Sequence, residues 1–183
     1  MTKKLISAVL VLVLGISLFT GCGSKVDEFV TVDNVNQSSV NVAEGFFQAI
    51  FTYDIELFEA CYPASFKDFE NEDGDRVDLG EVLFNYSTVL DPSYSYIGAS
   101  VSAYNDYSEE YGYTDFPELA QQIADVHHTS VDLIPQIQIV KLRLNFSDGS
   151  GNTMTTDVYV LVYKSEGAWY VYELQNSDAE FAV

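Results

Sequence analysis

The sequence predicts an α+β fold in which N-terminal helices pack on a curved, mainly antiparallel four-stranded sheet. Two observations predict it. In residues 41–62, apolar residues recur at the three- and four-residue spacing of a helix face. In residues 137–174, apolar and polar residues alternate instead, and turn signals rich in Gly and Ser separate the runs. Helices followed by antiparallel strands are typical of the α+β class.

The chain opens with a segment that is typical of an export signal. Lys3 and Lys4 precede an apolar run from Leu5 to Phe19, and Cys22 follows it closely. The run is shorter than the roughly 20 residues that a membrane-spanning helix needs. We therefore expect residues 1–21 to be a signal peptide.

Cys22 indicates which kind of export signal this is. The stretch before it resembles the lipobox of bacterial lipoproteins, with Gly21 in the last position and Phe19 where Leu is usual. The resemblance implies that Cys22 carries acyl chains, palmitate among them, and becomes the first residue of a mature protein on the extracytoplasmic side of the cell membrane. An uncleaved membrane anchor and a freely secreted protein are the alternatives, but neither explains the cysteine.

Acidic residues dominate the charge. The whole chain has 8 basic and 28 acidic residues, a formal charge of −20. Removal of residues 1–21 takes away two lysines and no acid, which leaves 6 basic against 28 acidic residues and a charge of −22. Such a surface is repelled by nucleic-acid phosphates and anionic lipid headgroups. We expect no nucleic-acid partner, and membrane attachment through acyl chains alone.

The remaining chain divides into a tether and one domain. Residues 22–39 are rich in Asn, Ser and Asp and lack helical periodicity, so we expect the lipidated cysteine and a flexible tether there. The short apolar group around Val30 leaves an edge strand open as an alternative. Residues 40–183 are expected to form a single α+β domain.

Two helices are expected at the start of this domain. Residues 41–51 form an amphipathic pattern, and a second pattern is capped by Asp54 and ended by Pro63. Cys61 lies on the apolar face of this second helix, where it is expected to be a core residue and not a reactive thiol. Residues 115–128 are expected to form a further helix. The region 66–93 stays undecided between helical and extended structure.

Four strands are expected, over residues 93–105, 137–146, 152–164 and 168–174. The last three indicate an antiparallel meander with one aliphatic face toward the helices and one mixed, aromatic face. In the first strand, we expect Ile97, Ala99 and Val101 on the buried face and tyrosines on the other. One core is expected from side chains of both halves: Phe46, Phe47, Ile50, Phe58, Leu142, Leu144, Val160, Val162 and Val171.

The order of elements, with the final hairpin VYVLVYKSEGAWYV around Trp169, resembles the nuclear-transport-factor-2-like, cystatin-related α+β superfamily, in the form found in small lipoproteins of Gram-positive bacteria. The resemblance covers about Asn41 to Leu174, apart from residues 66–93. It implies a sheet that wraps a long helix into a cone whose mouth can hold a ligand. The superfamily has no shared catalytic motif, so no functional residue is carried over.

No catalytic residue, metal site or cofactor is expected. The acidic run 68–81 fails as a calcium loop because Arg76 occupies the place of the required Gly and Val82 that of the required Glu. His127 and His128 are neighbours that point about 100° apart on a helix, so we expect them to be structural, near the helix C-terminal dipole. Motifs for serine hydrolases, zinc hydrolases, phosphate loops and dinucleotides are absent from the sequence.

Tyrosine is the one compositional excess, with seven of the 13 tyrosines between Tyr86 and Tyr113. Tyr94, Tyr96 and Tyr104 are expected to share one sheet face, where they serve either as packing or as a binding surface. The sequence favours a non-catalytic binding or interaction module that contacts a peptide, protein or glycan. The alternative is a small enzyme of isomerase or dehydratase type that uses a carboxylate in the cone.

Overall fold

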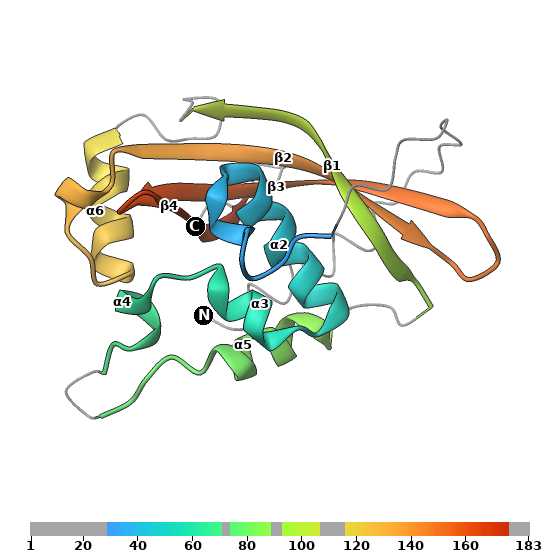
Figure 1. Cartoon of the computed structure of the whole chain (residues 1–183), viewed down its shortest axis with the longest axis horizontal. Coiled ribbons are helices and arrows are strands. Elements are labelled where there is room, and N and C mark those ends of the chain that lie inside the picture. Colours follow the sequence, from blue (N-terminus) through green and yellow to red (C-terminus); the bar gives the residue numbers. More distant parts are fainter. Residues whose placement is uncertain (1–28, 71–73, 89–92, 107–115, 176–183) are drawn as a thin grey trace.

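The computed structural model describes residues 29–70, 74–88, 93–106 and 116–175, the side chains of 102–106 and 173–175 excepted. Within these ranges the chain forms helices and a curled antiparallel sheet, so the predicted α+β class is confirmed (Figure 1). The arrangement is consistent with the cone-shaped, nuclear-transport-factor-2-like architecture. The elements are η1 (Val35–Gln37), α2 (Ser39–Thr52), α3 (Ile55–Ala60), α4 (Ala64–Lys67), α5 (Leu79–Ser87), β1 (Ser95–Asp106), α6 (Phe116–Val126), η3 (Val131–Leu133), β2 (Gln136–Ser147), β3 (Thr153–Ser165) and β4 (Ala168–Gln175).

The sheet is a simple meander in the order β1-β2-β3-β4, and all neighbouring strands are antiparallel. The turn between β3 and β4 consists of Glu166 and Gly167, which have φ angles of 52° and 88°. Two successive positive φ angles are typical of the two-residue hairpin turn whose twist matches that of the strands. The three-stranded C-terminal meander that the sequence predicts is therefore confirmed.

Helix α2 is the centre of the fold. Ser38 caps it by accepting a hydrogen bond from the backbone N–H of Asn41 at 3.0 Å. Its side chains are buried continuously from Val42 to Ile50, because the sheet lies on one side of the helix and α3 and α5 lie on the other (Figure 1). A helix that is buried all round is an interior element rather than an amphipathic surface helix.

The main core lies between α2 and the sheet. All nine side chains that the sequence predicts for it belong to one buried cluster. The predicted cap of α3 is also confirmed, because the Asp54 carboxylate accepts a hydrogen bond from Leu57 N at 3.0 Å. The undecided region before β1 contains α5, a helix that buries Leu79 and Leu83 against the same cluster.

A second buried cluster lies on the opposite face of the sheet. Helix α6 packs Leu119 and Ile123 against Ile139 of β2 and Leu161 of β3. The neighbouring residues on the same two strands, such as Val140 and Val160, point into the main core. The aliphatic face that was predicted to face the helices does so, but α6 also covers one end of the other face.

The folded domain begins earlier than predicted. Residues 29–38 were expected to belong to the tether, but Val30 and Val35 are buried in the main core. Gln48 of α2 holds Val30 by two buried hydrogen bonds, in which Val30 N donates to Oε1 at 2.9 Å and Nε2 donates to Val30 O at 2.8 Å. This segment forms a turn and the short helix η1, and it adds no strand to the sheet.

Candidate functional site

The sequence predicts a tyrosine surface on β1. Tyr94 and Tyr96 are partly buried and pack against the main core, on the side of the helices. Ile97, which was expected to be buried, is 38% exposed. The reason is an irregularity in the pairing with β2 between Tyr96 and Gly98, where Gly98 has a φ of 131°. The predicted burial is therefore wrong for Ile97 and for Val101, which is 41% exposed, and right for Ala99, which is buried in the main core.

Tyr96 belongs to a group of rings that we call the aromatic corner: Phe29, Phe51, Tyr96 and Phe146. Its ring stacks on Phe51 with centroids 5.4 Å apart, and it lies 6.0 Å from Phe146 and 6.3 Å from Phe29. The side chain of Tyr104 lies outside the described residues. The structure thus places two of the three predicted tyrosines in packing positions, and a binding role for the three together stays a prediction.

The hydroxyl group of Tyr96 is buried and has no hydrogen-bond partner within the described part of the chain. Burial raises the pKa of this phenol, and the nearby carboxylate of Glu44 raises the pKa further. Glu44 is itself buried on α2. A buried carboxylate beside a phenol is the arrangement here that comes nearest to an acid–base site.

His127 is the second buried titratable group. It follows α6 directly, and its Nδ1 lies 2.6 Å from the hydroxyl oxygen of Tyr163. Its ring also stacks on Phe66, with centroids 4.6 Å apart, and Ser65 Oγ donates to the His127 carbonyl at 2.7 Å. Burial, together with the charge of His128, lowers the pKa of His127 to about 4. The imidazole is neutral at pH 7 and ties the end of α6 to α4 and β3.

The two histidines do not share a site. His128 has a φ of 51°, and its ring stacks on Phe69 with centroids 3.4 Å apart. The contacts of both rings agree with the predicted structural role. The expected cause of that role, an interaction with the helix C-terminal dipole, does not hold for His127. A neutral His127 brings no positive charge to the helix terminus, so hydrogen bonding and ring packing replace the dipole interaction.

Cys61 is a buried core residue, as predicted. Its Sγ lies 3.3 Å from the carbonyl oxygen of Leu57, and burial raises the pKa of the thiol far above its usual value. A thiol that stays protonated is a poor nucleophile.

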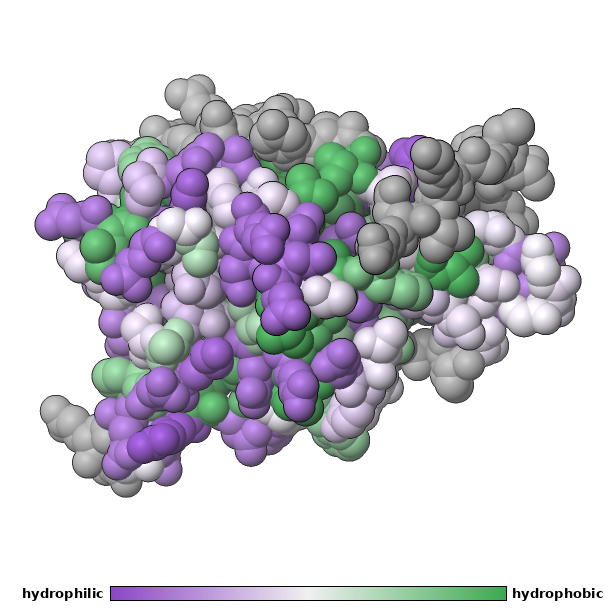
Figure 2. All heavy atoms as spheres, in the orientation of Figure 1, coloured by the Kyte–Doolittle hydropathy of each residue, from purple (hydrophilic) through white to green (hydrophobic). Residues whose placement is uncertain are grey.

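The acidic run does not assemble a metal site in the part that the structure describes. Glu70 accepts hydrogen bonds from Arg76 Nε at 3.2 Å and Nη2 at 2.9 Å, and Asp78 caps α5. Over the described ranges, no group of three His, Cys, Asp or Glu side chains could hold an ion. In Figure 2, the surface over α4 and the segment after it is mainly hydrophilic, as expected for a solvated acidic loop.

The outer face of the sheet carries a network that sequence reasoning missed. We call it the charged strip: Lys141 and Arg143 of β2, and Asp157 and Tyr159 of β3. Asp157 accepts hydrogen bonds from Arg143 Nε at 2.8 Å and Nη2 at 3.2 Å, and it lies 3.0 Å from Lys141 Nζ. These bonds, with that of Arg143 first, lower the pKa of Asp157.

Strand register brings these four residues together. Lys141 lies opposite Tyr159, and Arg143 lies opposite Asp157. Lys141 Nζ also sits 5.4 Å from the centre of the Tyr159 ring, within the range of a cation–π contact. The signal in the sequence was the alternation of Lys and Arg on one strand with Asp and Tyr on the next, but the register that aligns them is a tertiary property.

The expected lipid anchor at Cys22 and signal peptide lie outside the described residues. None of the helices in the described ranges combines the length and the hydropathy that crossing a bilayer would take. Comparison of the chain with models of known protein families, with curated proteins and with solved structures gives no match.

Proposed function

We propose that this protein is a lipoprotein, held by acyl chains on Cys22 at the extracytoplasmic side of the cell membrane, and that it acts there as a non-catalytic binding module. The observation that supports a binding role is the difference between the two faces of the sheet, since one is filled by apolar packing and the other carries exposed charged side chains. Large apolar side chains of α2, Phe46 and Phe47 among them, pack against the concave face. The outer face is covered by α6 at one end and presents the charged strip beside it, with Tyr159 packed against the edge of the α6 cluster.

The charged strip has the properties of a preorganised contact surface. Asp157 fixes both cationic side chains in place, so less rotamer entropy remains to be lost on binding. Arg143 is still 49% exposed at its side chain and offers donors to carbonyl or hydroxyl oxygens of a partner. Tyr159 adds ring area beside them. A neutral glycan or a peptide suits this combination, while the net charge of −22 of the mature chain, 6 basic against 28 acidic residues, repels polyanions.

Binding is tested on the mature chain by NMR titration with two defined probes, a neutral N-acetylglucosamine hexasaccharide and an uncharged peptide rich in Gly and Ser. The proposal expects shifts centred on β2 and β3 with at least one probe. Arg143→Ala with Tyr159→Ala should weaken that binding about tenfold or more, since such anchors dominate small interfaces. Lys164→Ala is the matched control, because Lys164 lies 6.0 Å from the Trp169 ring, outside the strip. Equal losses in both variants would remove the strip from the proposal.

Tethering is tested separately in cells. Cys22→Ala should abolish incorporation of labelled palmitate and shift the protein or its precursor out of its mature membrane-bound form. Unchanged labelling would contradict the anchor while leaving the binding results in place.

One observation favours the alternative, a carboxylate-based isomerase or dehydratase. It is the buried Glu44 with Tyr96 beside it. Such an enzyme removes a proton from carbon, so it should exchange deuterium from D₂O into a panel of ketones and hydroxy acids. Exchange that disappears in Glu44→Gln, in a variant of unchanged stability, would favour the enzyme over the binding module.

A further inference from the structure

We infer that the aromatic corner is the end of the domain that faces the lipid bilayer. The inference rests on the proposed acyl anchor at Cys22 and adds an orientation to it. It concerns where the tether leaves the fold, how far the tether reaches, and which side chains surround the exit.

The exit point of the chain is fixed to α2. The two buried hydrogen bonds between Gln48 and the backbone of Val30 hold the chain at this residue. Gly45 adds a steric requirement, because a Cβ at this position would lie 2.7 Å from Cγ2 of Val35 and 3.2 Å from Cγ1 of Val30. The absence of a side chain at Gly45 therefore lets the segment around Val30 and Val35 lie directly on the helix. The free tether ends at Phe29 and not at residue 39.

The tether that remains is short compared with the domain. From Cys22 to Val30 the chain reaches at most about 29 Å when fully extended, at up to 3.6 Å per residue. Strand β2, from Gln136 to Ser147, is about 37 Å long at 3.4 Å per residue. The bilayer is therefore within easy reach of one end of the sheet only.

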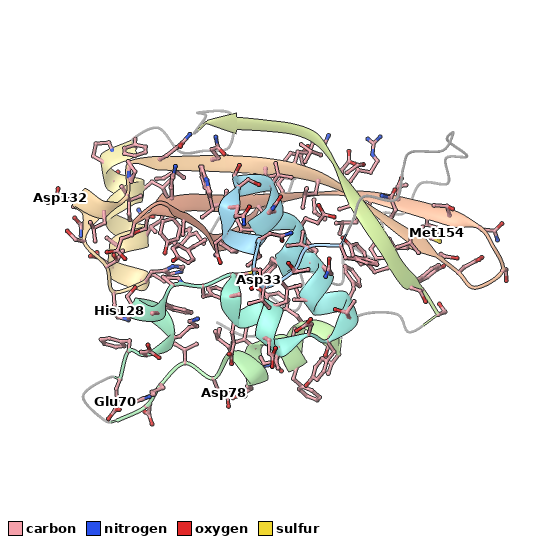
Figure 3. The ribbon with its side chains drawn as sticks, in the orientation of Figure 1. Asp33, Glu70, Asp78, His128, Asp132 and Met154 are labelled. Atoms are coloured by element: carbon pink, nitrogen blue, oxygen red, sulfur yellow. The ribbon has the colours of Figure 1, made fainter. Side chains whose placement is uncertain are left out.

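The aromatic corner lies at that end. Phe29 is the first described residue, and its ring contacts Tyr96. Tyr96 pairs with Phe146, which in turn pairs with Met154 on β3. Figure 3 shows Met154 at one end of the long axis and Asp132 of η3 at the other. The tether thus leaves the domain at the Met154 end, and η3 and α6 are held away from the membrane.

The surface chemistry at the two ends agrees with this orientation. Phe29 and Ile97 are exposed apolar side chains at the corner, and such groups suit the interface between headgroups and water. Glu70, Asp78 and Asp132 lie away from Met154 in Figure 3, so repulsion by anionic lipids turns them outward. Asp148, in the turn after β2, is an acidic residue on the side of the corner. Charge repulsion alone therefore does not set the orientation, and the short tether is its main cause.

The test uses the acylated mature protein, residues 22–183, in vesicles of phosphatidylcholine and phosphatidylglycerol. A dye is attached to Ile97→Cys at the corner or to Leu133→Cys in η3, two positions of equal exposure, 38% and 39%. Cys61 is buried and does not react, and Cys22 is acylated. Energy transfer to a short-range acceptor on lipid headgroups should be at least about threefold greater from position 97, given the short tether. Equal transfer from both positions, or greater transfer from 133, would overturn the orientation.

A second pair of variants tests the cause. Gln48→Leu removes both bonds to Val30, lengthens the free tether and should bring the two transfer efficiencies closer together. Gln37→Leu is the matched control, because the Gln37 amide donates only to Asp33 O at an exposed site, at 3.2 Å, and the difference should persist. An unchanged difference in Gln48→Leu would exclude the clamp as the cause. Flotation of the vesicles separates the two proposals: protein that fails to float contradicts the anchor itself, whereas floating protein with equal transfer contradicts only the orientation.

Discussion

The buried imidazole of His127 makes stability depend on pH in one direction. Its pKa is about 4 in the folded protein and about 6.5 when exposed, so the unfolded chain binds the proton more tightly. The folded state is favoured above pH 6.5, and this advantage is lost as the pH falls toward 4. The groups that face the ring are the phenols of Tyr62, Tyr163 and Tyr172, which carry no charge in this range, and His128 adds repulsion.

Replacing this residue should flatten the acid dependence. Between pH 7 and pH 4, wild type should lose up to about 3 kcal/mol of unfolding free energy through this group, and His127→Gln should not. Urea unfolding of both proteins at several pH values measures the difference, in which contributions from the many surface carboxylates cancel. Parallel curves for the two proteins would show that His127 does not titrate as the contacts require.

The phenols of Tyr96 and Tyr163 differ in hydrogen bonding and offer a matched comparison. Tyr96→Phe removes a hydroxyl that has no partner in the described structure, so the melting temperature should stay constant or rise. Tyr163→Phe removes the partner of His127 Nδ1 and should cost about 1–3 kcal/mol, because a buried ring nitrogen then lacks its bond. Thermal unfolding compares the two. Equal effects would contradict the different hydrogen bonding of the two phenols.

Phe46 and Phe84 compare a core ring with a surface ring. Phe46 is buried and contacts Phe47, Phe58 and Tyr62, so Phe46→Ala should cost about 3–5 kcal/mol. Phe84 of α5 is 53% exposed, and Phe84→Ala should change stability by no more than about 0.5 kcal/mol. Denaturant unfolding checks both. A loss below about 1 kcal/mol at Phe46 would be incompatible with its place in the core.

At the scale of elements, the sequence predicts what depends on local pattern. The helix signals at Asp54 and Pro117 and the hairpin signal at Gly167 act within a few residues, and the corresponding elements are found. The tertiary contacts of residues 29–38 could not be predicted in this way. Their polar composition resembles a linker, and only the positions of Gln48 and Gly45 on a neighbouring helix show why the segment folds.

Local pattern also could not predict two surfaces, the side-chain faces of β1 and the charged strip. The irregular pairing at Gly98 reverses the side-chain pattern of β1, and a period-two pattern cannot show where such a bulge occurs. The charged strip depends on the alignment of Arg143 with Asp157 across two strands. Residue types that are unremarkable along the chain become a site only through this register.

The contact between η1 and α2 gives a prediction that runs against helix propensity. Gly45→Ala should favour the helix by up to about 1 kcal/mol, but the new methyl group meets Val35 at 2.7 Å. We expect a net loss of about 1 kcal/mol or more, since overpacking in a tight contact commonly costs that much. Val35→Ala removes the clashing methyl group, so the double variant should be more stable than the sum of the two changes by about 1 kcal/mol. Additive effects in denaturant unfolding would contradict the contact.

At the scale of the whole molecule, the centre of the main core follows from the sequence, whereas the second cluster and most of the candidate site do not. The nine predicted core residues are found together because the spacing of hydrophobic residues along the chain indicates which side chains are buried. This indication does not depend on how the elements pack in detail. Binding chemistry on a sheet face has no comparable local code. Charge is an intermediate case: the value of −20 argues against polyanionic partners but does not show where Arg143 and Lys141 gather.

The two buried clusters on opposite faces of β2 and β3 divide the molecule into units of unequal strength. The cluster beneath α6 is small and shares no side chain with the main one, although both use the same strands. A fluctuation that lifts α6 exposes Ile139 and Leu161 but leaves α2 packed on the far face. Amide hydrogen exchange should therefore occur in two tiers, with α6 opening locally and α2 exchanging only when the whole domain unfolds.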